Sequence, residues 1–210
     1  MNQNIEKIKV KNGYSLPFME SFTTIQGEGL YSGHSAHFLR IGGCDLGCHW
    51  CDIKESWNSD LYPIVEVEKI LKTINSSIDL VIISGGEPLI WNMSPLTEAL
   101  KKMNKKVHLE TSGAYTLSGK WDWICLSPKK NKQPIQEIYK KANELKIIVY
   151  NKDDLKFANE NAKNVKKDCA LFLQPEWSVK EKVMPLIGKF ILENSNWKVS
   201  LQTHKYLGLE

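Results

Sequence analysis

Three cysteines lie close together in the stretch GGCDLGCHWCD, which covers residues 42–52. Cys44, Cys48 and Cys51 have the spacing C-x3-C-x2-C, and clustered thiols of this kind are typical of metal or redox chemistry. The chain holds five cysteines, an odd number that does not suit a disulfide framework. A tetrahedral metal site usually takes four protein ligands, so the identity of the fourth ligand becomes the question.

Two kinds of metal site are compatible with this spacing. A Cys3His zinc site would take its fourth ligand from His49, His34 or His37. An iron–sulfur cube would bind the three thiolates through three irons and leave the fourth iron open to a small molecule. Cys125 and Cys169 lie within apolar segments and are expected to be ordinary buried residues.

The segments that must position these cysteines alternate between strand and helix patterns. Strands are predicted at 36–41, 80–84, 107–111, 123–127, 146–150, 170–174 and 197–202, and helical patterns at 64–74, 94–103, 134–144, 153–162 and 179–193. This alternation predicts an α/β fold with right-handed βαβ units and a parallel sheet. Only about 11 residues separate Thr111 from Trp123, too few for a crossover helix, so one helix of a regular barrel is expected to be absent.

Chemically capable polar groups follow five of the predicted strands. They are Ser84-Gly85-Gly86, Glu110-Thr111, Ser127-Pro128-Lys129, Gln174-Pro175 and Gln202-Thr203-His204. Parallel α/β folds bind ligands beside the carboxyl ends of their strands, so these groups predict one shared ligand mouth. The alternative is that these residues are polar because turns are polar.

Composition indicates a single globular domain over residues 1–210, in which residues 1 to about 17 form an N-terminal extension. The net charge of +4 is mild, and the lysine-rich runs at 101–106 and 129–132 are expected to be solvated, so we expect no nucleic-acid partner. No apolar run approaches the length of a membrane span and no signal peptide opens the chain. We therefore expect no membrane partner and a cytoplasmic location.

Several motifs resemble those of one enzyme family. CDLGCHWC, with an aromatic residue before the last cysteine, resembles the signature of the radical S-adenosylmethionine (SAM) superfamily, and ISGGEP (83–88) resembles its glycine-rich segment. TIQGEGLYSGHSAHFLRIGGCDLGCHWCD, LETSG, LSPK, LQPEW and QTHKYLG occur in the order typical of the 7-carboxy-7-deazaguanine synthases. This resemblance extends from about residue 18 to the last residue.

The resemblance implies a partial, pared-down (β/α) barrel with parallel strands. It also implies a carbon–nitrogen lyase of queuosine biosynthesis that contracts the ring of 6-carboxy-5,6,7,8-tetrahydropterin to 7-carboxy-7-deazaguanine and releases ammonia. A [4Fe–4S] cluster and SAM would be the cofactors, and SAM would be used catalytically, since the hydrogen atom taken from the pterin is returned. The implied partners are the pterin, an electron donor such as flavodoxin or ferredoxin, and a second copy of the chain.

The resemblance also implies roles for individual residues. The cluster ligands would be Cys44, Cys48 and Cys51. The residues expected to bind SAM are Trp50, Asp52, Gly86, Ser127, Pro128, Lys129, Gln174 and Pro175. The residues expected to bind substrate are Ile25, Gln26, Gly27, Glu28, Arg40, Ser84, His204 and the terminal carboxylate of Glu210. A carboxylate and an amide suit the nitrogen-rich edge of a pterin, and a planar guanidinium suits a carboxylate.

One position departs from the pattern of the family. The family typically has Thr or Ser directly after WCD, where the hydroxyl ligates Mg2+, whereas this chain has Ile53. Because Mg2+ prefers hard oxygen ligands, either the ion is held by Asp52, backbone and water, or a protein cation such as Lys54 replaces it.

Two other functions are compatible with part of this pattern. A small glycyl-radical activase would also carry C-x3-C-x2-C, but it has no reason to carry IQGEG and QTHKYLG. A zinc- or cluster-stabilised binding module would be colourless or would not react with SAM.

Overall fold

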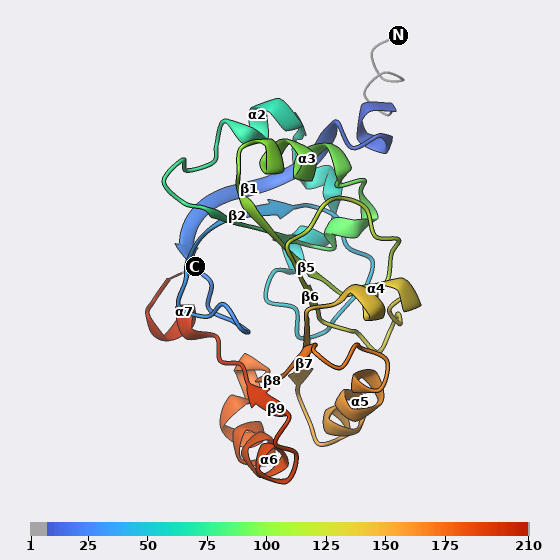
Figure 1. The fold of residues 1–210 in the computed structure, drawn as a ribbon, viewed down its shortest axis with the longest axis vertical. Helices are drawn as coiled ribbons and strands as arrows, with labels where there is room; N and C mark the ends of the chain where they lie inside the picture. The colour runs from blue at the N-terminus through green and yellow to red at the C-terminus, as the bar shows by residue number, and fades with distance from the viewer. Residues whose placement is uncertain (1–7, 210) are drawn as a thin grey trace.

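The computed structural model describes residues 8–209. Its strands form one sheet in the order β3-β1-β2-β4-β5-β6-β7-β8-β9 (Figure 1). The strands are β1 (Ser15–Ile25), β2 (Ser35–Ile41), β3 (Ile64–Glu66), β4 (Leu80–Gly85), β5 (Lys106–Thr111), β6 (Trp123–Leu126), β7 (Glu144–Val149), β8 (Ala170–Pro175) and β9 (Trp197–Val199). Besides a helical stretch at residues 8–11, the α-helices are α2 (Val67–Leu71), α3 (Ser94–Lys102), α4 (Gln136–Lys141), α5 (Asp153–Ala162), α6 (Lys180–Glu193) and α7 (Thr203–Tyr206). Short 3-10 turns are η1 (Lys54–Trp57), η2 (Ser59–Leu61), η3 (Pro88–Ile90) and η4 (Trp177–Val179).

The sheet is a partial barrel whose strands are mostly parallel, which confirms the predicted fold class. Every neighbouring pair from β2 to β9 is parallel, whereas β1 pairs antiparallel with both β2 and β3. Within residues 8–209 the edge strands β3 and β9 are not paired with each other, so the barrel is open. None of the helices described here is long and apolar enough to cross a membrane.

Strand β1 was not predicted, and it overlaps the stretch interpreted as an N-terminal extension. Ser15, Leu16 and Pro17 pair with β3, and Leu16 is fully buried. The strand mixes polar and apolar residues without a clean alternation, and most of its residues are half-buried, so its sequence lacks the usual strand pattern. The predicted helix at 64–74 is correspondingly divided, since Ile64–Glu66 forms β3 and only Val67–Leu71 is helical.

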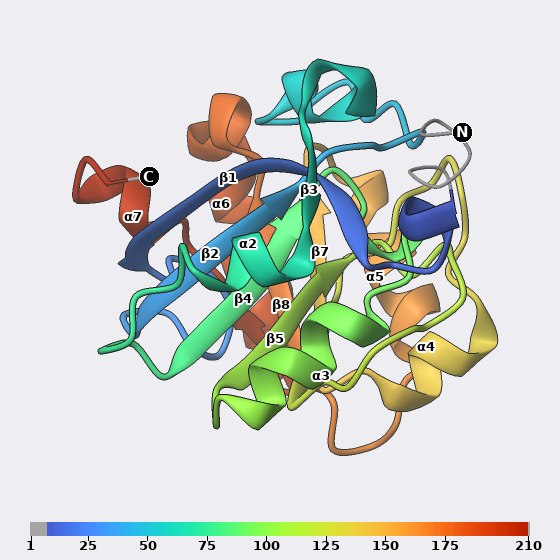
Figure 2. The same ribbon diagram turned by 90° about the horizontal axis from the view of Figure 1, so that it is seen from above.

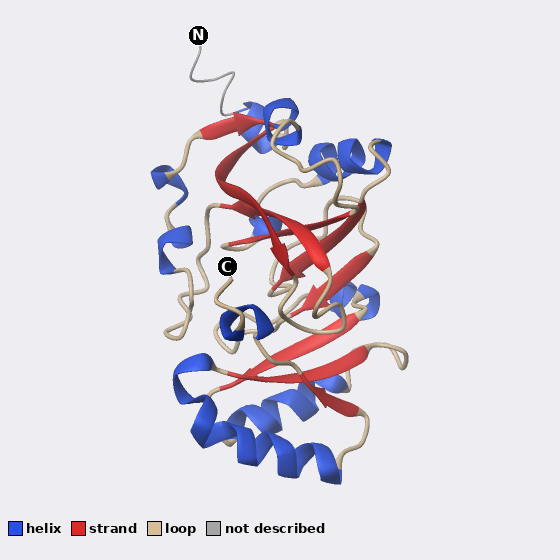
Figure 3. Ribbon diagram, turned by 90° about the vertical axis from the view of Figure 1, so that its left-hand side faces the viewer, coloured by secondary structure: helices blue, strands red, loops and turns tan. Residues whose placement is uncertain are grey.

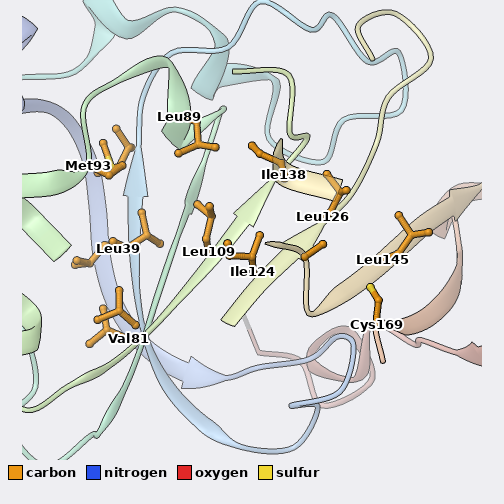
Figure 4. Close-up of a cluster of buried hydrophobic side chains, with 14 of the residues drawn as sticks. Leu39, Val81, Leu89, Met93, Leu109, Ile124, Leu126, Ile138, Leu145 and Cys169 are labelled. Carbon is orange, nitrogen blue, oxygen red and sulfur yellow. The ribbon is translucent and has the colours of Figure 1, made fainter. Parts of the chain in front are cut away.

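The helices cover the outer face of the curved sheet and bury its alternate side chains (Figure 2). In Figure 4, Leu39, Val81, Leu109 and Leu126 point from β2, β4, β5 and β6 into one cluster. Met93, Leu89 and Ile138 meet them from the turns and helices, and Cys169 belongs to the same apolar cluster. Burying each aliphatic side chain contributes roughly 1.5–3 kcal/mol, so this layer fastens the helices to the sheet.

The intervening side chains on these strands point into the barrel, where Ala36, Leu80 and Ile82 form a small apolar cluster and strands β5 to β7 contribute polar groups. Successive residues of a strand face opposite sides, so Glu110, Cys125, Glu144 and Lys146 share the inner face. Cys125 is buried as expected, and its Sγ donates to Oε1 of Glu144 over 3.5 Å. As predicted, no helix lies between β5 and β6.

The C-terminal segment bridges the open side of the barrel. The backbone N–H of Thr203 donates to the carbonyl of Gly27 over 2.9 Å, and the hydroxyls of Ser32 and Thr203 lie 3.1 Å apart. Helix α7 therefore lies against the loop 26–34, close to the end of β1 in Figure 1. Figure 3 shows the same segment between the two halves of the sheet.

Candidate active site

The three clustered cysteines lie on the loop that follows β2. Backbone hydrogen bonds hold the start of this loop, since Gly43 N–H donates to Ser56 over 2.7 Å and Cys44 N–H donates to Trp57 over 3.0 Å. None of the three cysteines is in a disulfide, and all are half-buried. Burial raises the pKa of the Cys44 thiol to about 11, so a metal must displace protons when it binds these thiols.

The arrangement fits an iron–sulfur cube better than a closed zinc site. Among residues 8–209, no three His, Cys, Asp or Glu side chains converge closely enough to hold a single ion. The candidate fourth ligands have other partners: His49 packs edge-on against Tyr150 at 4.9 Å between ring centroids, and His37 lies between hydroxyls of β1. A cube binds each thiolate through a different iron, so its ligands need not converge on one point.

The glycine-rich end of β4 packs directly on the cluster loop. Gly86 N–H donates to the carbonyl of Ile41 over 3.0 Å, and Glu87 N–H donates to that of Gly43 over 2.8 Å. A Cβ on Gly86 would lie 2.3 Å from the Gly43 carbonyl oxygen, so a larger residue would displace the loop. Gly85 has a φ of +137°, in the region that glycine tolerates best. Both glycines are therefore required by the close approach of two backbones.

A cavity of about 370 Å³ opens inside the barrel, beside this loop. All seven described residues predicted to bind substrate line it, namely Ile25, Gln26, Gly27, Glu28, Arg40, Ser84 and His204. Glu210 lies outside the described residues, although Leu209 reaches the cavity wall. Phe22 and Phe38 form an apolar part of the wall, with their rings stacked at 5.4 Å.

Two smaller cavities adjoin the cluster loop and contain most of the residues predicted to bind SAM. One, of about 170 Å³, is lined by Trp50, Asp52, Gln174 and Pro175, and shares Asp52, Ile53, Gly85 and Gln202 with the large cavity. The other, of about 120 Å³, is lined by Trp50, Pro128 and Lys129. Gly86 and Ser127 do not line these cavities, and the Ser127 hydroxyl accepts from Lys129 Nζ over 2.6 Å.

The walls of the large cavity carry fixed charges. Lys146 Nζ donates to Glu28 over 2.6 Å and to Glu110 over 2.9 Å. Burial alone would raise the pKa of Glu28, but the Lys146 ammonium and hydrogen bonds from Lys146, Gln202 and Gln174 lower it to about 2. Arg40 forms an ion pair with Glu20, and its guanidinium lies 4.8 Å from the centroid of the Phe22 ring. The cavity thus offers carboxylate acceptors and a planar cation to one ligand.

The junction between the two cavities does not fit a magnesium ion. Ile53 contributes only an aliphatic side chain, and Oδ2 of Asp52 already accepts from Lys205 Nζ over 2.9 Å and from Gln202 Nε2 over 3.1 Å. One paired carboxylate is a poor substitute for the oxygen-rich shell that Mg2+ requires. The ammonium that reaches Asp52 belongs to Lys205, not to Lys54, which is exposed and lines neither cavity.

Comparison with known proteins agrees with this geometry. The profile of the radical SAM superfamily matches residues 39–126, which include all three clustered cysteines and the glycine-rich segment. A protein of Flavobacterium psychrophilum named 7-carboxy-7-deazaguanine synthase is 54% identical over 97% of this chain and 97% of its own length. The chain belongs to the 7-carboxy-7-deazaguanine synthase family.

Other members of the 7-carboxy-7-deazaguanine synthase family extend the likeness. The Synechocystis synthase is 44% identical over 93% of this chain and 94% of its own length. The Escherichia coli K12 synthase is 31% identical over 92% of this chain and 98% of its own length. A crystal structure described as QueE from Escherichia coli superposes with a TM-score of 0.80 at 28% identity, covering 91% of this chain and 96% of that one. The protein is therefore a radical SAM lyase, and a [4Fe–4S] cluster and SAM are its cofactors.

The structure adds site residues to which the sequence assigned no role. Glu110 and Gln202 were noted only as polar groups at strand ends, and Lys205 only as part of QTHKYLG, yet all three line the large cavity. No motif contains Lys146, and the signal for it in the sequence is a lysine inside the apolar run of β7. A charge placed between apolar residues that point to both faces of a strand requires a buried partner.

Proposed function

We propose that the protein converts 6-carboxy-5,6,7,8-tetrahydropterin into 7-carboxy-7-deazaguanine with release of ammonia, using SAM catalytically, in queuosine biosynthesis. One observation carries the proposal. The seven described residues expected to bind substrate line a single cavity, and that cavity shares a wall with the cavity that contains Trp50, Asp52, Gln174 and Pro175. Substrate and SAM would therefore meet across Asp52, Ile53, Gly85 and Gln202.

The residues of the large cavity suit the two ends of a carboxypterin. Glu28 is ionised at neutral pH, so its oxygens accept hydrogen bonds from the amino-pyrimidine part of the ring, and Gln26 offers both a donor and an acceptor. Arg40 offers its fork to the substrate carboxylate, with His204 beside it on the cavity wall. Held at both ends, the pterin has one orientation relative to the neighbouring SAM cavity.

The chain also supplies the setting for radical chemistry. When bound, the cluster and SAM would supply a 5′-deoxyadenosyl radical, and with it the reversible hydrogen-atom transfer at C6 of the pterin that the ring contraction needs. Phe22 and Phe38 present apolar rings to the large cavity, and Ile148, Pro175 and Trp177 do the same for the smaller one. These apolar walls would limit the access of water to the bound groups.

Partners and location belong to the same proposal. The chemistry requires a one-electron donor, for which we propose flavodoxin or ferredoxin, and the resemblance favours a homodimer. All five cysteines are free, which favours a reducing compartment and hence the cytoplasm. Mg2+ would be at most weakly held, because the residues at the cavity junction do not fit it.

The proposal is tested by anaerobic reconstitution with iron and sulfide, followed by incubation with SAM, reductant and carboxytetrahydropterin. We expect mass spectrometry to find 7-carboxy-7-deazaguanine with the wild-type chain and not with Cys48→Ala. Absence of this product in a preparation that cleaves SAM would overturn the substrate assignment. A colourless preparation that does not cleave SAM would instead favour a binding module, and full activity of Cys48→Ala would exclude the radical mechanism.

A further inference from the structure

Lys146 is the most completely buried cation of the site, and the proposed function does not yet use it. It lies on β7, points to the inside of the barrel and has a side-chain exposure of only 4%. A buried ammonium is costly unless opposite charges and hydrogen bonds compensate for lost water. The role of Lys146 can therefore be inferred from the groups that its ammonium contacts.

Lys146 joins two carboxylates that come from distant parts of the chain. Its Nζ lies 2.6 Å from Oε2 of Glu28, on the loop after β1, and 2.9 Å from Oε2 of Glu110, on β5. The remaining oxygens are also fixed: Gln202 Nε2 donates to Oε1 of Glu28 over 2.9 Å, and Gln26 Nε2 donates to Oε1 of Glu110 over 3.2 Å. Each carboxylate is thus held at both oxygens before any ligand enters.

The position of Lys146 relative to the cavity separates its role from that of its partners. Glu28, Glu110, Gln26 and Gln202 all line the large cavity, whereas Lys146 is not among its lining residues. The ammonium lies behind the carboxylates and acts on a ligand only through them. A carboxylate oxygen has more than one acceptor position, so oxygens bound to Lys146 still accept from a ligand.

More acidic groups than basic groups surround the Lys146 ammonium. Facing Lys146 are Glu28, Glu110, Glu144 and Cys125 from four elements, and their combined effect keeps the pKa of Lys146 well above its usual value although burial would lower it. Lys129 also acts on Lys146, and His204 faces Glu28. Burial raises the pKa of Glu144, whereas for Glu28 the Lys146 ammonium and the hydrogen bonds outweigh burial and lower the pKa to about 2.

We propose that Lys146 is a positioning residue that holds Glu28 and Glu110 as a fixed acceptor pair in the wall of the substrate cavity. This pair suits a ring edge that presents adjacent N–H donors, as an amino-pyrimidinone does. The proposal rests on the proposed function for the identity of the ligand. It extends that function by assigning Glu110 to substrate recognition and Lys146 to its preorganisation.

The first test measures the pKa of the Glu28 carboxyl and does not require enzyme turnover. With 13C-labelled glutamate, and with Glu28→Gln to assign the signal, the Glu28 carboxyl of the wild type should not titrate between about pH 8 and 4, since its pKa is about 2. In Lys146→Met the same signal should titrate within this range, because the compensating charge is gone and burial then raises the pKa. A wild-type Glu28 with an ordinary pKa would overturn the proposal even if no variant folded.

The second test separates positioning from structural support. Lys146→Met should raise KM for the pterin at least about tenfold at pH 7, and further as pH falls, while kcat changes less. Lys146→Gln, which keeps a donor without the charge, should lie between Lys146→Met and the wild type. Lys101→Met is the matched control, because it removes a 2.7 Å ion pair with Asp122 outside the cavity and should leave KM unchanged.

The outcomes distinguish this proposal from the proposed function. If Lys146→Met lowers only the melting temperature and keeps the wild-type KM at every pH, Lys146 is structural and the proposal is wrong. If the wild type makes no 7-carboxy-7-deazaguanine, the proposed function fails, whereas the glutamate titration still reports on Lys146.

Discussion

At residue 53 the chain has an aliphatic side chain where its relatives were expected to carry a hydroxyl. Ile53 lines both the large cavity and the cavity beside the cluster loop, so it lies where substrate and SAM would meet. The neighbouring Asp52 is paired with Lys205, which places a protein cation at the same junction. The cation beside Asp52 is therefore the ammonium group of Lys205.

Activity should consequently depend little on added Mg2+. After treatment with a chelator, we expect the initial rate of the wild type to change less than about twofold with Mg2+, because its side chains supply too few hard oxygens. Ile53→Thr adds a hydroxyl and should respond more strongly, and its binding of Mn2+, followed by electron paramagnetic resonance, should be tighter. A steep Mg2+ requirement in the wild type would contradict this expectation.

The contact of Gly86 with the cluster loop leaves no room for a side chain on residue 86. Gly86→Ala would place its Cβ 2.3 Å from the Gly43 carbonyl oxygen and 2.9 Å from Cys44 Cβ, so the loop must move. We expect reconstituted Gly86→Ala to bind less iron and to show weaker cluster absorbance than the wild type. Gly188→Ala is the control and should bind iron normally. Gly188 is exposed on α6, and no atom lies within 4 Å of a Cβ added there.

At the scale of elements, the site depends on the contact between loop 26–34 and α7. Gly27 lies against His204, since a Cβ on Gly27 would be 1.8 Å from His204 Nδ1 and 2.9 Å from its backbone nitrogen. The same contact contains the hydrogen bond from Thr203 to the Gly27 carbonyl. Two segments at opposite ends of the chain thus form one wall of the cavity.

Gly27→Ala should separate these two segments. Because the added methyl group displaces His204 and the start of α7, we expect KM for the pterin to rise about tenfold or more while the cluster content stays normal. Steady-state kinetics and iron analysis of the same preparation measure both. An unchanged KM would indicate that His204 and α7 do not contribute to substrate binding.

At the scale of the whole molecule, three buried or half-buried histidines couple stability to pH. Burial lowers the pKa of His108 to about 4, and it also lowers the pKa of His37 and His204. The folded state therefore binds fewer protons than the unfolded state below the ordinary pKa of histidine. This part of the stability is present above about pH 6.5 and is lost as pH falls towards the folded-state value.

We expect the free energy of unfolding to decrease as pH is lowered from 7.5 to 5.5, with His108 alone contributing roughly 1 kcal/mol of the loss. Anaerobic urea unfolding followed by tryptophan fluorescence measures the change. His108→Phe keeps an aromatic ring against Tyr31 and Trp123 and should show a smaller decrease over this pH range. An equal decrease in both proteins would assign the effect to other groups.

The lysine-rich run at 101–106 illustrates how folding changes the meaning of a charge pattern. Lys105 is buried, and its Nζ donates to the carbonyls of Ile78 over 2.6 Å and Ser76 over 2.9 Å. Lys101 is paired with Asp122. The run was expected to be solvated, yet two of its lysines connect the loop before β4 and the segment before β6 to the rest of the fold.

The sequence by itself determined the features that depend on short spacing or local periodicity. The C-x3-C-x2-C loop, the glycines after β4, the apolar strands and the absence of a helix between β5 and β6 all follow from residues within a few positions of one another. Their motifs also identified the family. Local sterics and side-chain periodicity act on neighbouring residues, so they can be read from a sequence.

Only the tertiary structure decided which distant groups meet. The pairing of β1 with β3, the cation Lys205 at Asp52, and the Lys146 ammonium between Glu28 and Glu110 join residues as many as 153 positions apart. No local pattern specifies such partners, because the energy of a buried charge depends on what folding places around it. The cysteines and glycines of the site are therefore evident in the sequence, whereas its electrostatics exist only in the folded chain.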